Sequence, residues 1–273
     1  MKNTTIALVV QNCITGELKA NLDVCIDYSE KAADQGASIV LFPEMNLTGY
    51  SSGKELWDIA VPLSETICKR LLHTAETKDI TLVAGLAHLE KMENQQRIFA
   101  SQIVVFPDGR ISIYKKIHAA PPEKDHLCTG DKIPCFHSAP GVTFGIQLCY
   151  DAHFPELSTR MAMEGVDLIM MPHASPRGTS REKFDSWMRH LRARAFDNSV
   201  FIAAVNQTGS NGRGLDFPGV AAVLGPDGHI ISRSLTKSET LMVTKLDAKQ
   251  LENVRNHRMK YFLPNRRKDF YFS

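Results

Sequence analysis

Hydrophobic positions along this chain fall into two patterns: short continuous apolar runs, and longer stretches in which apolar residues recur at helical spacing. The first pattern occupies residues 5–11 and 38–44, and the second occupies residues 17–36 between them. The apolar positions near one face of this stretch are Leu22, Cys25, Ile26 and Ala33. Gly36 follows as a suitable helix stop, so the chain is predicted to open as strand, helix and strand.

Both patterns continue through the rest of the chain. The further expected helices span 63–78, 154–165 and 181–198, and the further expected strands span 81–87, 98–106, 110–117, 142–148, 167–171, 200–205, 220–224 and 229–233. The segments 107–109 and 225–228 contain Pro-Asp-Gly, a turn sequence in which proline fixes φ and glycine permits positive φ. Strands covered by helices, with hairpins between them, predict a layered α/β protein with a mixed sheet.

Composition is typical of an ordinary globular protein. The chain has 273 residues, of which 43% are hydrophobic and 23% charged, so a sizeable core is expected. No composition break resembles a linker, and we predict a single domain over residues 1–273. We expect the C-terminal segment 250–273, which carries a basic cluster followed by aromatic residues, to dock on the body or on a partner subunit.

Charge and hydropathy exclude several classes of partner. The 32 basic and 30 acidic residues leave a net charge of only +2, which gives no electrostatic footprint for nucleic acid or an anionic membrane. No apolar run approaches the length that spans a bilayer, and residues 6–10 are too few for a signal-peptide core. We therefore expect a cytoplasmic protein.

Six cysteines are spread through the chain without a C-x-x-C pair: Cys13, Cys25, Cys68, Cys128, Cys135 and Cys149. In a cytoplasmic protein of this size they are expected to be free thiols, which leaves them available for chemistry. One local pattern offers an alternative, a tetrahedral zinc site built from His126, Cys128, Cys135 and His137. Their spacing is not the common one, and we expect no metal and no cofactor.

Cys149 ends an apolar strand and precedes a helix that is expected to begin near Phe154. Pro155 suits the first helical turn, where its missing N–H would be unpaired anyway. A thiol at such a junction feels the positive end of the helix dipole, which favours the reactive thiolate. On these residues alone, a buried structural cysteine is an equally good interpretation.

Glutamate and lysine side chains are further candidates for catalysis. Glu44 closes an apolar strand, and strand ends in α/β proteins are where side chains converge on a crevice. Apolar surroundings would raise its pKa and suit it to act as a general base, although a solvated glutamate would give the same pattern. Lys115 and Lys116 are adjacent, so one faces inward and the other outward, and nothing local distinguishes them. Glu123 belongs to a loop, where glutamates usually face solvent.

Short motifs along nearly the whole chain resemble those of one protein family. They are Phe42-Pro43-Glu44, Tyr114-Lys115-Lys116-Ile117-His118, Glu123 with Gly130, Cys149-Tyr150-Asp151 with Phe154-Pro155-Glu156, Gly165-Val166-Asp167-Leu168 with Pro172, Arg194-Ala195 with Asn198, and Asn206 with Gly209. In this order and spacing they resemble the signatures of the nitrilase superfamily of carbon–nitrogen hydrolases. Each fragment is weak alone, whereas the whole set in register is highly specific.

The resemblance implies a fold and roles for individual residues. The fold would be an α-β-β-α sandwich that pairs through its helices into homodimers or larger homo-oligomers. Cys149 would be the nucleophile and Glu44 the general base. Lys116, rather than Lys115, would be the cation of the site. Glu123 would match the family's second glutamate, which positions groups in the pocket.

Further residues are expected to line or support this pocket. The backbone N–H of Tyr150 would stabilise developing negative charge together with Lys116. The side chains proposed for the pocket are Tyr50, Asp151, His153, His173 and Arg177. Arg177 is a candidate to pair with a substrate carboxylate, although a surface loop arginine is an equally good interpretation.

The sequence leaves more than one substrate class open. Nitrile-cleaving members of the family typically carry Trp-Glu after the cysteine, whereas this chain has Tyr150-Asp151. This difference favours a small amide or an N-carbamoyl compound, hydrolysed with water through a cysteine thioester and with release of ammonia. Nitrile hydrolysis is one alternative, and a non-catalytic oligomeric scaffold of the same fold is another. The presence of all three catalytic side chains argues against the scaffold.

Overall fold

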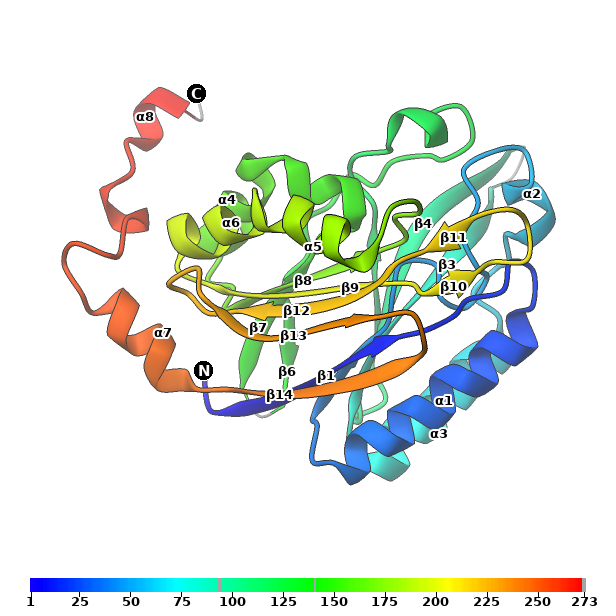
Figure 1. The fold of residues 1–273 in the computed structure, drawn as a ribbon, viewed down its shortest axis with the longest axis horizontal. Coiled ribbons are helices and arrows are strands. Elements are labelled where there is room, and N and C mark those ends of the chain that lie inside the picture. Colours follow the sequence, from blue (N-terminus) through cyan, green and yellow to red (C-terminus); the bar gives the residue numbers. More distant parts are fainter. Residues whose placement is uncertain (93–94, 140, 272–273) are drawn as a thin grey trace.

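The computed structural model describes residues 1–92, 95–139 and 141–271, and two mixed sheets form its centre (Figure 1). The first sheet has the order β14 (Thr240–Leu246), β1 (Thr4–Val10), β2 (Ile39–Leu41), β3 (Thr81–Met92), β4 (Gln95–Val105) and β5 (Ile111–Lys115). The second has the order β13 (Ile230–Thr236), β12 (Gly219–Leu224), β9 (Phe201–Asn206), β8 (Leu168–His173), β7 (Val142–Ile146) and β6 (Phe136–Ser138). A short ribbon pairs β10 (Gly209–Ser210) with β11 (Asp216–Phe217).

The two sheets are built on the same plan. Strands β1, β2 and β3 are parallel in the first sheet, and β7, β8 and β9 are parallel in the second. Antiparallel strands flank each trio on both sides. The residues that follow parallel strands emerge at one edge of a sheet. In each sheet, the loops after the three parallel strands therefore lie at the same edge.

Helices cover the outer face of each sheet, as Figure 1 shows. Helices α1 (Leu18–Asp34) and α3 (Glu65–Lys78) lie against the first sheet, whereas α4 (Pro155–Met163), α5 (Ser180–Met188) and α6 (Leu191–Asn198) lie against the second. Alternation along β1 produces two cores, because Leu8 packs in the core between the sheets and Val9 packs in the core beneath α1 and α3. The predicted α-β-β-α sandwich is therefore confirmed.

In the second half of the chain, one helix differs from the sequence prediction. Residues 181–198 were expected to form one long helix, but the structure divides them into α5 and α6 at His190. The backbone of His190 leaves the helical region, with φ −121° and ψ −37°. Its ring lies against His153, with the two ring centroids 4.7 Å apart, so a tertiary contact accompanies the break in the regular helix.

Strand β14 is absent from the sequence prediction because its residues are only partly buried and show weak alternation. Strand β14 forms by antiparallel pairing with β1, from Thr4 opposite Leu246 to Val10 opposite Thr240. Short elements that the pattern also misses are α2 (Leu56–Ile59), α7 (Ala248–Arg255) and α8 (Lys268–Tyr271).

After β14 the chain runs along the outside of the sandwich through α7 to α8 (Figure 1). Arg255 anchors α7 by donating to Asp167 Oδ1 at 2.7 Å and to the carbonyl oxygen of Val166 at 2.9 Å. Beyond it, the side chains of Met259 and Phe270 are largely exposed. Docking of the segment 250–273 on a partner stays a prediction. Among the described residues, no helix is both long and apolar enough to cross a bilayer.

Candidate active site

Four side chains meet between the two sheets, each carried by a strand end or the loop that follows it. Glu44 lies just beyond β2, Lys116 directly follows β5, and Glu123 ends a short 3-10 turn, Pro121–Glu123, in the next loop. Cys149 comes from the second sheet, where it follows β7 and opens the 3-10 turn Cys149–His153. The structure thus places together the residues that the sequence singles out for chemistry.

Lys116 joins the two glutamates in one buried cluster. Its Nζ donates to Glu44 Oε1 at 2.8 Å, to Glu123 Oε2 at 2.8 Å and to Glu123 Oε1 at 3.0 Å. All three side chains are at most 2% exposed. Glu123 also accepts from the hydroxyl of Tyr50 and from the backbone N–H of Ala120, both at 2.8 Å. Its hydrogen-bonding capacity is therefore used to hold the Lys116 ammonium in place.

Lys115 points the other way, as strand alternation requires. Its Nζ donates to Glu90 Oε2 at 2.8 Å and lies 4.1 Å from the centroid of the Phe99 ring, with the side chain 29% exposed. The structure therefore distinguishes the two adjacent lysines, and Lys116 is the inward one.

The buried cluster holds two carboxyl groups and one ammonium. Burial raises the pKa of Glu44 to about 7, and the negative charge of Glu123 adds to this effect, while the positive charge of Lys116 opposes it. Burial alone would lower the pKa of Lys116, but the charges of Glu44 and Glu123 raise it above its ordinary value. These shifts favour the charged form of Lys116 and bring the pKa of Glu44 close to neutrality. The direction of this shift for Glu44 agrees with the sequence prediction.

Glu44 is held from several directions. Its Oε2 accepts the backbone N–H of Ala174 at 3.1 Å, and its backbone oxygen accepts Gln207 Nε2 at 2.8 Å. The loop after Glu44 lies directly on Gly85, where an added Cβ would come within 2.6 Å of the backbone nitrogen of Met45. Gln207 and Gly85 are not singled out by the sequence pattern, because their roles depend on contacts between distant segments.

Cys149 faces this cluster from the opposite wall. It has φ +42°, an unfavourable backbone conformation for a residue with a side chain. Burial of the sulfur raises the pKa of Cys149 to about 12, and the charge of Glu44 adds to the effect, whereas Lys116 opposes it. The N–H of Ala174 lies within hydrogen-bonding reach of the sulfur as well.

The expectation of a thiolate stabilised by a helix dipole is therefore wrong for the free site. Helix α4 begins only at Pro155, and the residues from Cys149 to His153 form a 3-10 turn instead. Burial and the neighbouring carboxylates disfavour a negative charge on the sulfur and favour the neutral thiol.

Asp151 and Arg194 hold the turn that carries Cys149. Asp151 is fully buried and accepts from the hydroxyl of Tyr114 at 2.7 Å and from the backbone N–H groups of His118 and Leu148 at 2.8 and 3.0 Å. Arg194 donates from α6 to the carbonyl oxygens of Ala152 and His153 at 3.2 and 3.1 Å. Asp151 therefore supports the pocket from behind instead of lining it. Tyr114 belongs to a quoted motif, but only its contact reveals this function.

The other pocket candidates have different surroundings. His173 is buried, contacts the carbonyl oxygen of Met171 through Nδ1 at 2.8 Å, and packs against Trp187. Burial lowers the pKa of His173 to about 3, so the ring is neutral. His153 is exposed beside the ring of Tyr150. Arg177 is also exposed, in a loop where its backbone N–H donates to the carbonyl oxygen of Asp216 at 3.0 Å, away from the cluster.

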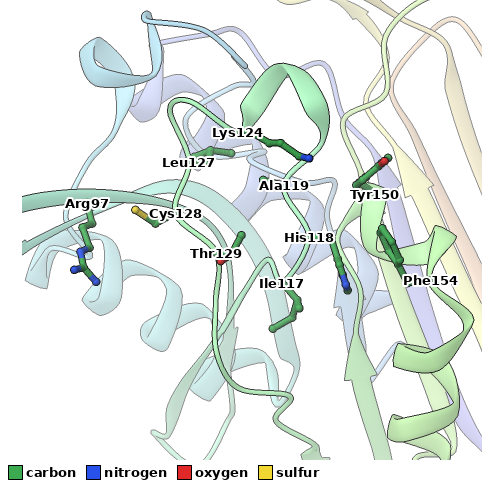
Figure 2. Close-up of a pocket in the computed structure, with 10 residues that line it drawn as sticks. All are labelled: Arg97, Ile117, His118, Ala119, Lys124, Leu127, Cys128, Thr129, Tyr150 and Phe154. Atoms are coloured by element: carbon green, nitrogen blue, oxygen red, sulfur yellow. The ribbon is translucent and has the colours of Figure 1, made fainter. Parts of the chain in front are cut away.

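A cavity of about 710 Å³ lies beside the site, between the loop after Lys116 and the turn after Cys149 (Figure 2). Its lining includes Ile117, Leu127, Tyr150 and Phe154, with the cationic side chains of Arg97 and Lys124 at its rim. Tyr150 directly follows Cys149 and Ile117 directly follows Lys116, so the cavity lies along the two chain segments that carry these site residues, although its lining includes neither Cys149 nor Lys116.

The alternative of a zinc site finds no support among the described residues. No three histidine, cysteine or acidic side chains there are grouped so that they could hold a metal ion. Cys128 lines the cavity of Figure 2, whereas Cys135 and His137 line a separate hollow with Arg160 and Glu164.

Comparison with known proteins identifies the family. The family model described as carbon–nitrogen hydrolase matches residues 5–256, and the chain belongs to this family. It is 29% identical to an (R)-stereoselective amidase of Pseudomonas sp over 80% of this chain and 76% of that protein. It is 28% identical to a nitrilase of Pyrococcus abyssi over 89% of each protein.

Solved structures agree. The crystal structure of an amidase from Nesterenkonia sp. has 25% identity and a TM-score of 0.81, covering 98% of this chain and 95% of that one. A mutant of the Nesterenkonia sp. AN1 amidase, at 26% identity and a TM-score of 0.78 over 93% and 94% of the two chains, shows covalent addition of the acetamide moiety of fluoroacetamide at the active-site cysteine. The predicted reaction class, hydrolysis of carbon–nitrogen bonds, is thereby confirmed.

Proposed function

We propose that this protein is an amidase that hydrolyses small amides through a thioester on Cys149, with Glu44 as the general base. The observation that carries the proposal is the environment of Glu44. It is a buried carboxyl group with a pKa of about 7, fixed between the Lys116 ammonium and the Ala174 N–H, which also reaches the sulfur. Such a group can accept and return a proton near neutral pH.

Acylation begins with a neutral thiol. As the sulfur of Cys149 attacks the amide carbon, its proton passes to the Glu44 carboxylate and the carbonyl electrons move to oxygen. The Lys116 ammonium and the backbone N–H of Tyr150 stabilise that oxygen. When the carbon–nitrogen bond breaks, Glu44 gives the proton to the departing nitrogen, which leaves as ammonia.

Deacylation reuses the same groups. Glu44, again a carboxylate, removes a proton from water as the water oxygen attacks the thioester carbon. The carbon–sulfur bond then breaks, and the proton held by Glu44 returns to the sulfur. Glu123 keeps Lys116 in place through both halves of the reaction, because its carboxylate accepts from the ammonium and is itself held by the hydroxyl of Tyr50.

An amide is favoured over a nitrile by the residues that follow the nucleophile, Tyr150 and Asp151 in place of Trp-Glu. The mutant of the Nesterenkonia sp. AN1 amidase with alanine in place of a cysteine was solved in complex with butyramide, which agrees with this choice. An N-carbamoyl compound presents the same carbonyl and amino group and stays within the proposed substrate class.

The test is ammonia release from butyramide, a matched N-carbamoyl amine and butyronitrile. We expect turnover of the amide and little or none of the nitrile. Faster ammonia release from the nitrile would overturn the amide assignment. Absence of turnover on a broad panel, together with a Cys149 that does not react with iodoacetamide, would favour a non-catalytic scaffold.

We further propose that the protein is cytoplasmic and forms a homodimer or larger homo-oligomer through the face of α6 and the C-terminal segment. Phe196 and Phe262 support the pairing, because they are 44% and 39% exposed and their rings lie 5.4 Å apart. Light scattering on the wild-type protein and on Phe196→Glu tests it. A wild-type monomer would contradict the proposal.

A further inference from the structure

Glu44 stands at the second position of a tight turn by which the chain leaves the first sheet. Strand β2 ends at Leu41, and the Asn46 N–H closes the turn by donating to the carbonyl oxygen of Pro43 at 3.3 Å. Met45, at the third position, has φ +53°, which is unfavourable for a residue with a side chain. Such a backbone costs free energy, so contacts from elsewhere must hold the turn that presents Glu44.

The side chain of Asn46 holds the end of this turn on β3. Its Oδ1 accepts the backbone N–H of Gly85 at 2.7 Å, and the next residue, Leu47, donates its N–H to the Gly85 carbonyl oxygen at 2.9 Å. The amide oxygen thus takes the place that a strand carbonyl would have if β2 continued. Gly85 permits this close approach, since an added Cβ would lie 2.6 Å from the Met45 nitrogen.

The other end of the same amide is fixed as well. Asn46 Nδ2 donates to Gln11 Oε1 at 3.0 Å, and Gln11 Nε2 in turn donates to the carbonyl oxygen of Asn21 at 3.1 Å. Asn46 and Gln11 are both fully buried. Because the oxygen and the nitrogen of Asn46 have different partners, only an amide in one orientation satisfies both. Gln11 directly follows β1, so Asn46 ties the turn to two strands of the first sheet.

The turn must place the Glu44 carboxyl group accurately between two partners. One is Lys116 Nζ at 2.8 Å, and the other is the Ala174 N–H, from the second sheet, at 3.1 Å. Displacement of a reacting group by about 1 Å can lower a rate about a hundredfold. The contacts that fix the backbone of Glu44 therefore bear on the rate of proton transfer.

We propose that Asn46 is a positioning residue of this enzyme: its side-chain amide locks the turn and thereby holds Glu44 where it acts as the general base. This inference rests on the amidase proposed above and adds a residue that acts through Glu44. Loss of the amide should therefore lower kcat and change the pH dependence of the reaction, with little effect on KM.

Asn46→Leu and Thr48→Val provide a matched test. Leucine has nearly the shape of asparagine but no hydrogen-bonding atoms. Thr48 is also buried, and its Oγ1 accepts the Ala87 N–H at 2.9 Å, so each variant removes a bond from a buried side chain to the backbone of β3. We expect both variants to lower the thermal unfolding midpoint, whereas only Asn46→Leu should reduce kcat for butyramide, by about tenfold to a hundredfold.

The pH profile of kcat/KM is the readout that a merely structural role would not move. In Asn46→Leu the midpoint of the rise, at about pH 7 in the wild type, should move to higher pH, because a displaced Glu44 lies farther from Lys116, whose positive charge lowers its pKa. The other ionisable groups that face Glu44 are the same in both variants: Tyr50, Tyr114, Glu123, Cys149 and Asp151. Thr48→Val should keep the wild-type midpoint.

An unmoved pH midpoint in Asn46→Leu, or the same shift in Thr48→Val, would overturn the inference. If Asn46→Leu does not fold, Gln11→Met decides, since it removes the second anchor of the amide and leaves the bond to Gly85. Its kcat should fall about twofold to tenfold with the same direction of pH shift, and wild-type values would overturn the inference. A wild type without turnover would reject the amidase and this inference together, whereas an active wild type beside an unmoved Asn46→Leu rejects this inference alone.

Discussion

The two sheets share a strand plan but contribute opposite kinds of group to the site. The first sheet provides the charges, with Glu44 beyond β2, Lys116 beyond β5 and Glu123 in the loop that follows. The second sheet provides a neutral thiol on strained backbone, Cys149, and the N–H of Ala174. Charge and nucleophile therefore lie on opposite walls, and under the proposed mechanism the proton of the thiol is transferred when a substrate binds.

The walls also differ in how they are held. The charged wall is a closed network of buried ion pairs, so removal of one member leaves an uncompensated charge behind. The thiol wall is held by hydrogen bonds to the backbone of its turn, from Asp151 and Arg194. We therefore expect changes on the charged wall to reduce both stability and activity, and loss of the thiol to reduce activity alone.

Replacement of Cys149 should have the largest effect on turnover. Cys149→Ala removes the nucleophile, and we expect kcat to fall by at least about 10⁴-fold. The thermal unfolding midpoint should stay close to that of the wild type, because the thiol forms no ion pair. Ammonia release and circular dichroism on the same samples provide the check. Residual turnover within tenfold of the wild type would contradict a role as nucleophile.

The adjacent lysines give the sharpest contrast between a buried and an exposed ion pair. Lys116→Ala should abolish turnover and destabilise the fold by about 3–5 kcal/mol, because Glu44 and Glu123 lose their counterion. Lys115→Ala breaks a partly exposed pair with Glu90 and should cost about 0–1 kcal/mol, with activity retained. Urea unfolding and ammonia release measure both. An inactive Lys115→Ala with an active Lys116→Ala would show that the lysine assignment is reversed.

The pH dependence of kcat/KM tests the general base. Glu44 must be ionised to accept the thiol proton, and its pKa is raised to about 7 by burial. Activity should therefore rise with pH through about 7, since the carboxyl group is protonated below this value and ionised above it. Glu44→Gln should lose turnover and this dependence together. A profile that is flat between pH 5 and pH 8 would be incompatible with Glu44 as the base.

Asp151 should give a smaller effect than Cys149, Lys116 and Glu44. Asp151→Asn keeps the size of the side chain but weakens the hydrogen bonds that hold the turn of Cys149, and we expect a loss of stability of about 1–3 kcal/mol. Its kcat should fall about tenfold with little change in KM, because the turn positions the sulfur without touching substrate. Measurement of kcat and KM for butyramide decides this. A change confined to KM would instead make Asp151 a substrate contact.

Most of the fold was predictable because buried parallel strands and amphipathic helices have strong local patterns, as residues 39–41 and 18–34 illustrate. Strand β14 was not predictable, because it depends on pairing with β1. The break at His190 was not predictable either, because it accompanies a contact with His153. In the candidate site, Glu44 and Cys149 were recognisable at strand ends, and Lys116 through the family resemblance. The Ala174 N–H became visible only through a contact that connects distant segments.

The central claim is that Cys149 carries the acyl group during turnover. Rapid acid quenching of a reaction with butyramide, followed by mass spectrometry of the intact protein and its peptides, tests this most directly. The account predicts one added butyryl group per chain, located on the peptide that contains Cys149 and absent from Cys149→Ala. Steady turnover of butyramide without any acylated protein, or acylation at another residue, would contradict it.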